Sequence, residues 1–243
     1  GTGRAYSWCD QVGNIGTAGL VEKEQCQRSY NRAGRIVSVE TEKRIRTGVE
    51  KLSLSLPEGA IEKLQSYLDL LVKWNGAYNL TAIRDPGQMV VKHLLDSLSI
   101  VPYVQGASLI DVGTGAGLPG LVLAIALPEL EVTLLDSNGK KVRFLRQVIA
   151  DLKITNASAV HARVEEFDRQ FDLVSSRAFA TLADMVNGSQ QLLARNGEFL
   201  AMKGVSPTEE NAALPEGFSV KDVVPLTVPF LDEERHLVRI VRN

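Results

Sequence analysis

The sequence has only two cysteines among its 243 residues, Cys9 and Cys26, and both lie near the amino terminus. No histidine is close enough in sequence to complete a zinc site with them, so we expect no disulfide scaffold and no metal site. Apolar runs stay well short of the roughly 20 residues that span a bilayer, and a signal-peptide pattern is missing. We therefore expect a cytoplasmic protein without membrane contact.

A strong excess of charge is also missing, since the formal net charge is −2 at pH 7. The chain therefore has no overall positive charge that would indicate nucleic-acid binding, and any such contact must come from local clusters of basic residues. What the chain does have is length and apolar content. With 44% hydrophobic residues it can fill the core of one α/β domain with a smaller appendage.

Three parts follow one another along the chain. Residues 1–40 fit neither helical nor strand spacing, and we expect a flexible extension there rather than a binding arm. Residues 41–104 form a helical region, with an amphipathic helix predicted over 58–78. A second helix is predicted to start at Asp85-Pro86, where Asp can cap and Pro suits the first turn, and to run to about Tyr103. His93 within it is expected to be partly exposed.

Strands and helices alternate over residues 105–243, the third part. Strands are predicted at 109–112, 131–136, 158–162, 171–175 and 198–202, and helices at 118–127, 140–152 and 182–193. Val142, Leu145, Ile149 and Leu152 are predicted to face inward. Two alternating runs, 220–228 and 236–241, predict an antiparallel pair at the sheet edge. The fold class is therefore α/β, a doubly wound and mostly parallel sheet.

This domain is organised around residues 109–120, Leu-Ile-Asp-Val-Gly-Thr-Gly-Ala-Gly-Leu-Pro-Gly. A strand that passes into a helix through alternating glycines presents its backbone to a nucleotide-like ligand. Gly115, Gly117 and Gly120 match the G-x-G-x-x-G of dinucleotide-binding proteins. The segment 111–117 equally matches the acid-led pattern of S-adenosylmethionine-dependent methyltransferases, and either match alone is weak.

Asp111 favours the methyltransferase interpretation. A carboxylate before the glycines would repel a pyrophosphate, whereas a zwitterionic methionine moiety with a sulfonium would tolerate it. The alternative is a strand-end acid satisfied by neighbouring N–H groups. Asp136 ends the next strand and could accept hydrogen bonds from both ribose hydroxyls of either cofactor.

Side chains that follow the later strands complete the predicted site. Val164 could pack on an adenine ring and Glu165 could accept from its amino group, although a solvated Glu is the alternative. Arg177 is carried by the fourth strand to the carboxyl edge of the sheet, where ligands bind in this architecture.

Several motifs together resemble one family, the bacterial 16S ribosomal RNA guanine-N7 methyltransferase, also called glucose-inhibited division protein B. The motifs are Asn79-Leu80-Thr81, His93-x-x-Asp96-Ser97, residues 111–120, Leu135-Asp136-Ser137, residues 163–167, Ser176-Arg177-Ala178, Met202-Lys203-Gly204 and residues 234–237. The resemblance implies a seven-stranded, Rossmann-like class I methyltransferase, S-adenosylmethionine as the cofactor and a guanine in the decoding-region loop of 16S ribosomal RNA as the target. It also places Gly113, Leu118, Val164, Glu165 and Arg177 on cofactor-binding positions, beside Asp111, Gly115, Gly117 and Asp136 from the residue-level argument.

Methylation of guanine N7 removes no proton from the nucleophile, so Arg177 is expected to act by alignment and electrostatics without a general base. The partner would be 16S ribosomal RNA or the small ribosomal subunit, and we expect a monomer. Candidates for RNA contact are Lys73, Asn79, Arg84, Lys92, His93, Arg143, Arg146, Lys203 and Arg235. Two other classes stay open: an NAD-type Rossmann oxidoreductase, and a catalytically silent methyltransferase-like RNA-binding protein.

Overall fold

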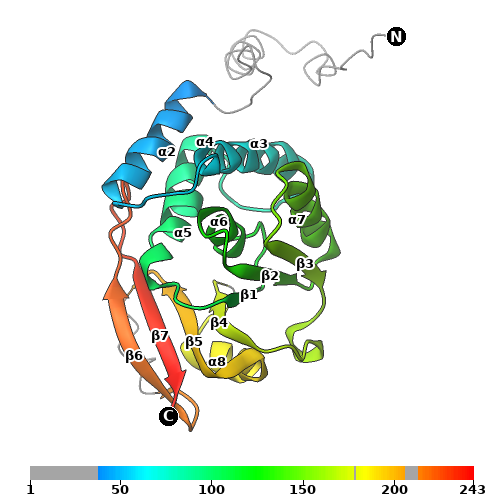
Figure 1. Ribbon diagram of the computed structural model, residues 1–243, viewed down its shortest axis with the longest axis vertical. Coiled ribbons are helices and arrows are strands. Elements are labelled where there is room, and N and C mark those ends of the chain that lie inside the picture. The colour runs from blue at the N-terminus through cyan, green and yellow to red at the C-terminus, as the bar shows by residue number, and fades with distance from the viewer. Residues whose placement is uncertain (1–37, 178, 206–212) are drawn as a thin grey trace.

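The computed structural model describes residues 38–177, 179–205 and 213–243, so all but the end of the predicted extension over 1–40 lies outside it, as does Ala178. Its strands are β1 (Ser108–Val112), β2 (Glu131–Asp136), β3 (Ala157–His161), β4 (Phe171–Ser176), β5 (Leu193–Lys203), β6 (Phe218–Pro225) and β7 (His236–Arg242). They form one seven-stranded sheet in the order β3-β2-β1-β4-β5-β7-β6 (Figure 1). The first five are parallel and β7 runs antiparallel to both β5 and β6, which confirms the predicted sheet and its edge.

The strand order places a topological switch point beside β1. The chain leaves β1 for β2 and β3 on one side and returns to β4 on the other. Connections that run in opposite directions from neighbouring strands leave a crevice at the carboxyl ends of those strands. The glycine loop after β1 therefore lies at the switch point of the sheet.

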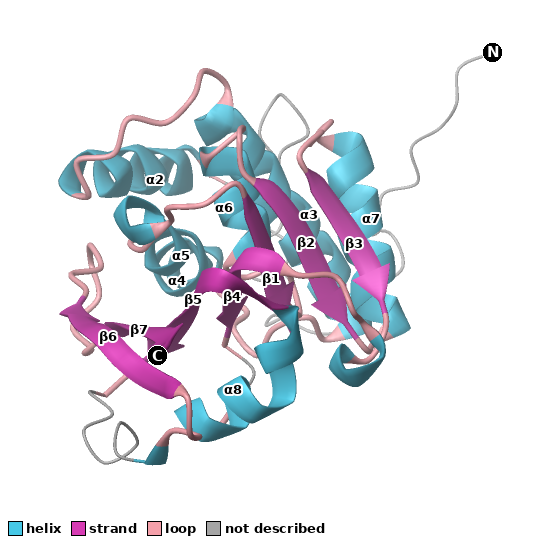
Figure 2. Cartoon of the chain, turned by 60° about the horizontal axis from the view of Figure 1, so that its bottom comes forward, coloured by secondary structure: helices cyan, strands magenta, loops and turns pink. Residues whose placement is uncertain are grey.

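Helices cover the two faces of the sheet unequally, as Figure 2 shows. On one face lie α6 (Gly120–Ala126) and α7 (Gly139–Asp151), and α3 (Ala60–Tyr78) packs over both. The other face carries α8 (Leu182–Ser189) with the short turns η4 (Val164–Glu166) and η5 (Gln190–Leu192). Each face has its own apolar core, and the larger core extends into the amino-terminal helices.

The predicted amino-terminal helices form, with one difference in winding. Leu64, Leu68 and Leu71 of α3 are fully buried, as their spacing predicts. Asp85 caps α4 (Pro86–Met89) by accepting from the Gln88 N–H at 2.7 Å, also as predicted. Beyond it the helix winds as a π-helix, η2 (Val90–Leu95), and ends as α5 (Asp96–Leu98), before the 3₁₀ turn η3 (Val101–Tyr103). A further helix, α2 (Val39–Lys51), packs against this stretch, and none of the helices in the described residues is long and apolar enough to cross a membrane.

Boundaries in the sheet domain differ where apolar residues are compatible with either helix or strand. The helix predicted over 182–193 ends at Ser189, because Leu193 pairs with Phe171 and begins β5. The helix predicted from 118 begins at Gly120. Within α7, Val142 and Leu145 are buried as predicted, whereas Ile149 and the following Leu152 are only partly buried.

Candidate functional site

The glycine loop between β1 and α6 is open at its first two glycines and packed at its last two. Gly113 is exposed with φ +65°, and a Cβ added to Gly115 (φ +61°) would meet no other atom closer than 4.0 Å. A Cβ at Gly117 would lie 2.8 Å from a leucine methyl, and one at Gly120 would lie 2.5 Å from a methyl of Leu134. The backbone at the first two glycines is therefore accessible to a ligand, while the other two let the loop pack against the sheet domain.

Asp111 accepts hydrogen bonds from both ends of this loop. Its side chain is fully buried, and Oδ2 accepts from the Thr114 hydroxyl at 2.6 Å and from the Gly120 N–H at 2.8 Å. Oδ1 accepts from the Ser175 hydroxyl at 3.2 Å, and burial raises the pKa of the carboxyl to about 6. The geometry is that of the alternative interpretation, a strand-end acid satisfied by its neighbours, and it gives Asp111 no surface for direct contact with a cofactor.

Asp136 and Tyr67 fix the same loop from β2 and α3. Asp136 is 6% exposed, and its carboxylate accepts from the N–H groups of Gly115 and Asn138, each at 2.8 Å. The fully buried Tyr67 hydroxyl donates to the Ala116 carbonyl at 2.7 Å. Tyr67 was not predicted, although a hydroxyl-bearing ring within the apolar face of a helix needs a partner and is a signal for one.

The remaining predicted cofactor residues lie at the carboxyl edge of the sheet. Leu118 in the glycine loop is 8% exposed. Val164 is partly buried and Glu165 is exposed on η4, the turn that follows β3. The turn is anchored by Gln191, whose amide donates to the Val164 carbonyl at 3.0 Å. Both faces of the sheet thus supply residues to this edge.

Three predicted site residues meet in one network of charges. Arg177, whose side chain is 32% exposed, places Nη1 3.5 Å from Asp96 Oδ2, and Arg235 places Nε 3.3 Å from Asp96 Oδ1. Arg235 also pairs with Glu233 at 3.0 Å, and Lys92 pairs with Glu233 at 2.6 Å. These ion pairs join the amino-terminal helix to the ends of β4 and β7. No pattern in the sequence alone predicts that these elements meet.

Other candidates for RNA contact form no ion pair with this network among the described residues. Arg84 donates to the Asn75 carbonyl at 3.0 Å and to Asn79 Oδ1 at 2.8 Å, so it closes the turn after α3. Lys73 is exposed on α3, and Lys203 donates to the Ala180 carbonyl at 2.8 Å.

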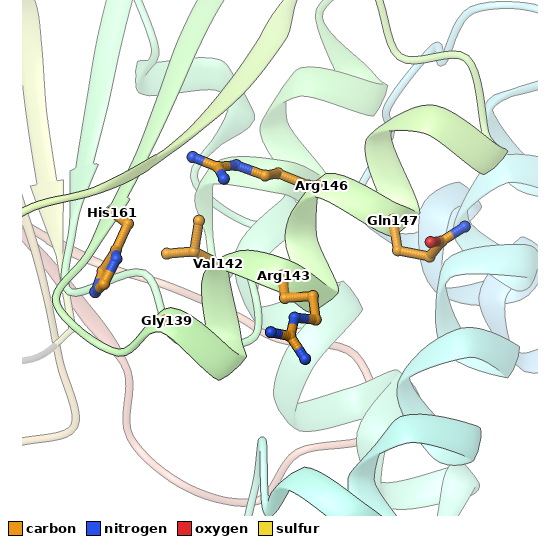
Figure 3. Close-up of a pocket in the computed structure, with 6 residues that line it drawn as sticks. All are labelled: Gly139, Val142, Arg143, Arg146, Gln147 and His161. Atoms are coloured by element: carbon orange, nitrogen blue, oxygen red, sulfur yellow. The ribbon is translucent and has the colours of Figure 1, made fainter.

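Arg143 and Arg146 do share a surface hollow, which Figure 3 shows. Its lining residues are Gly139, Val142, Arg143, Arg146, Gln147 and His161. Both arginines come from α7, and His161 ends β3 with Nε2 3.0 Å from the Ser137 carbonyl. Across residues 38–177, 179–205 and 213–243, neither arginine forms an ion pair, and Arg146 donates only to the Ala159 carbonyl. The hollow is therefore a cationic surface beside the carboxyl edge.

The expected partial exposure of His93 is wrong. The residue is 5% exposed, because its helix packs against α2, α3 and α6 and the His93 side chain lies on the buried side, whereas that of Lys92 lies on the exposed side. Its Nε2 lies 2.8 Å from the Thr81 hydroxyl, and burial lowers the pKa of the imidazole to about 4. A neutral, buried ring does not offer RNA a contact from this position.

The pH dependence of the free energy of unfolding should reveal the lowered pKa of His93. The unfolded chain binds a proton near pH 6.5 and the folded one only near pH 4, so the stabilisation is present above about pH 6.5 and is lost as the pH falls toward 4. We expect the native protein to lose about 2 kcal/mol relative to His93→Gln between pH 7 and pH 5. Urea unfolding of both proteins at the two pH values measures this, and equal losses would contradict a depressed pKa.

The seven-stranded sheet with its antiparallel β7, together with the glycine loop at the switch point, is a Rossmann-like class I methyltransferase fold. The fold is similar to that of the transferase PH0793 of Pyrococcus horikoshii, which is 13% identical, with a TM-score of 0.50 over 61% of this chain and 63% of that one. The family model described as rRNA small subunit methyltransferase G matches residues 60–238, and the chain belongs to that family.

Named relatives support the same membership. Ribosomal RNA small subunit methyltransferase G of Chromobacterium violaceum is 52% identical over 200 residues, which are 81% of this chain and 96% of the relative. The protein of the same name from Vibrio cholerae is 55% identical over 198 residues, 80% of this chain and 94% of the relative. The match thus extends over nearly the whole length of both relatives.

Proposed function

We propose that this protein transfers a methyl group from S-adenosylmethionine to N7 of a guanine in the decoding-region loop of 16S ribosomal RNA. The observation that carries the proposal is the glycine loop of a member of this family, in which Gly113 is exposed, Gly115 has free space around it and Asp111 is buried. A ribosomal RNA substrate implies that the reaction takes place in the cytoplasm.

The open part of the loop suits a cofactor that carries adenosine and a sulfonium. When bound, S-adenosylmethionine supplies an electrophilic methyl group. Gly113, Gly115 and the adjoining Leu118 would hold its central part, while Asp136 has lone pairs left for ribose hydroxyls beyond the two it uses. Val164 and Glu165 on η4 would pack on the adenine and accept from its amino group. Asp111 contributes by holding the loop in shape, and Gly117 by packing.

The same loop disfavours a dinucleotide. Proteins of that class bind a pyrophosphate at the first N–H groups of the helix after the loop. Here the N–H of Gly120, the first residue of α6, already donates to Asp111, and a pyrophosphate would approach that carboxylate. An NAD-type oxidoreductase is therefore the weaker proposal.

Guanine N7 presents a lone pair, so the chain has to align two reactants and needs no base. Arg177 lies at the end of β4 with about a third of its side chain exposed, and its charge can orient anionic or carbonyl groups of the cofactor and the target. The base must be unstacked for N7 to reach the methyl group in line, which favours a loop of the RNA as target.

Transfer of tritium from labelled S-adenosylmethionine tests the proposal. We expect label in 16S ribosomal RNA or in isolated small subunits, at a single guanine whose N7 methylation is mapped by chain cleavage. Binding of S-adenosylhomocysteine but not of NADH, measured by calorimetry, is expected alongside. Absence of transfer to free RNA, to assembly intermediates and to finished subunits would leave a silent RNA-binding protein.

Among the candidate RNA contacts, we expect the hollow on α7 to contribute most clearly to RNA affinity. Replacing Arg143 and Arg146 together by Gln should weaken RNA binding about tenfold at low salt and lower the slope of log affinity against log salt by roughly 1–2, because phosphate contacts are lost. Affinity for S-adenosylhomocysteine should stay unchanged. Filter binding at four salt concentrations measures both quantities.

A control pair removes the same charge elsewhere. Lys153 and Arg195 are exposed. They lie just before β3 and in the first part of β5, at the amino-terminal ends of the parallel strands and away from the carboxyl edge. Their joint replacement by Gln should leave affinity and slope as in the native protein. If the two double variants weaken RNA binding equally, the hollow is not an RNA contact.

A further inference from the structure

Asp96 is a buried carboxylate that contacts two arginines and has no part in the cofactor site described above. It is the first residue of α5 and is 2% exposed, although it belongs to the helical region and not to the sheet domain. Each of its oxygens faces a different guanidinium, Oδ2 that of Arg177 at 3.5 Å and Oδ1 that of Arg235 at 3.3 Å. The two arginines come from the end of β4 and from the residue before β7.

The arrangement has an energetic requirement that Asp96 meets. Burying a carboxylate is costly unless cations compensate it, and two guanidiniums near each other repel unless an anion lies between them. Burial raises the pKa of Asp96, while Arg177 and Arg235 act in the opposite direction and favour its charged form. Carboxylate and arginines therefore hold one another in place.

Arg177 depends on this contact more than Arg235 does. Arg235 has a second carboxylate, Glu233, which Lys92 also contacts. Within the described residues, Asp96 is the only acidic group that pairs with Arg177. At 3.5 Å this is a charge contact rather than a close hydrogen bond, so donors of Arg177 stay available to a ligand.

We propose that Asp96 is the positioning residue of Arg177, holding its guanidinium toward the cofactor edge while bridging to Arg235. This inference rests on the proposed function, because it assumes that Arg177 serves cofactor and target. It gives the helical region a part in the reaction, since α5 supplies the charge that orients a residue of the sheet.

Asp96→Asn removes the charge and keeps the size of the side chain. We expect affinity for S-adenosylhomocysteine to fall about tenfold, and the KM for S-adenosylmethionine to rise by a similar factor with a smaller loss of kcat. Glu198→Gln is the matched control, because Glu198 likewise bridges two cations, Lys221 and Arg239, away from the loop. That variant should bind the cofactor product as the native protein does.

A double-mutant cycle separates positioning from a general effect on folding. If Asp96 acts through Arg177, Asp96→Asn should change affinity less than twofold when Arg177→Gln is already present. An equal loss in both backgrounds, or no loss in either, overturns the inference. If Asp96→Asn does not fold, Asp96→Glu, which keeps the charge on a longer side chain, should show the same dependence on Arg177. Absence of binding to the native protein would instead count against the proposed function.

Discussion

Replacing Gly117 by Ala is expected to lower the free energy of unfolding by roughly 3 kcal/mol, whereas the same change at Gly115 should cost only about 1 kcal/mol. Both residues have positive φ, +98° and +61°. A Cβ at Gly117 would also lie 2.8 Å from Leu145 Cδ2 and 2.9 Å from Leu121 Cβ, while one at Gly115 would meet nothing closer than 4.0 Å. Backbone strain acts at both sites, and overlap with the core acts at one.

Cofactor affinity should reveal the change at Gly115, which the free energy of unfolding shows only weakly. The added methyl at Gly115 would point from the open part of the loop, so Gly115→Ala should fold and lose at least tenfold in affinity for S-adenosylhomocysteine. Urea unfolding and calorimetry on the same preparations give both quantities. Native affinity in Gly115→Ala would mean that the cofactor does not approach this surface, and a cost below 1 kcal/mol for Gly117→Ala would refute the packing argument.

Local sequence patterns predicted the strands, the sheet edge and the start of α4. The short apolar run 131–136 is typical of a buried parallel strand, and the observed bounds of β2 are the predicted ones. Asp85 and Pro86 each have a specific position at a helix start, and a short-range hydrogen bond suffices to fill it. Information within a few residues was enough in these cases.

Long-range contacts decided what local patterns could not. Leu193 joins a strand because Phe171 is available as a partner, and His93 is buried because three helices pack against its own. The predicted exposure of His93 failed since a mostly apolar helix with one Lys and one His does not show from its sequence which of the two side chains faces solvent. Asp96 shows the same limit, because its two arginines are distant in sequence.

The glycine loop combines both situations. Its position and its ligand class follow from the pattern 111–120, but the partners of Asp111 do not. One of them, Ser175, is 64 residues away and comes close because β1 and β4 pair in register at these two residues. Which glycines are open and which are packed equally depends on Leu134 and Leu145, from a later strand and a later helix.

Replacing Asp111 by Ala should be the most damaging single change in the loop. The Thr114 hydroxyl, the Gly120 N–H and the Ser175 hydroxyl would lose their buried acceptor, at an expected cost of about 3–5 kcal/mol in the free energy of unfolding. We expect affinity for S-adenosylhomocysteine to fall at least tenfold, because the loop loses the bonds that set its shape.

Asp172→Ala is the matched control for this change. Asp172 also accepts from three donors, the N–H groups of Ala107 and Ser108 and the Ser108 hydroxyl, but at the start of β1 and only partly buried. It should cost about 1–2 kcal/mol without altering cofactor affinity. Equal losses of affinity in the two variants would show a general effect of stability instead of a specific effect of the loop.

Asp111→Asn tests whether the buried charge itself is unfavourable. The folded protein binds a proton to Asp111 near pH 6 and the unfolded chain near its usual value of 3.8, so the stabilisation is present at low pH and is lost as the pH rises through 6. Relative to Asp111→Asn, which does not titrate, the native protein should gain about 1 kcal/mol on going from pH 7 to pH 5. This is the opposite direction to His93, so the two contributions offset each other in part in the native protein, and the two single variants should reveal each of them separately. If the stability difference between Asp111→Asn and the native protein did not vary with pH, Asp111 would not carry a raised pKa, and the ionised carboxylate would be fully compensated by its three donors.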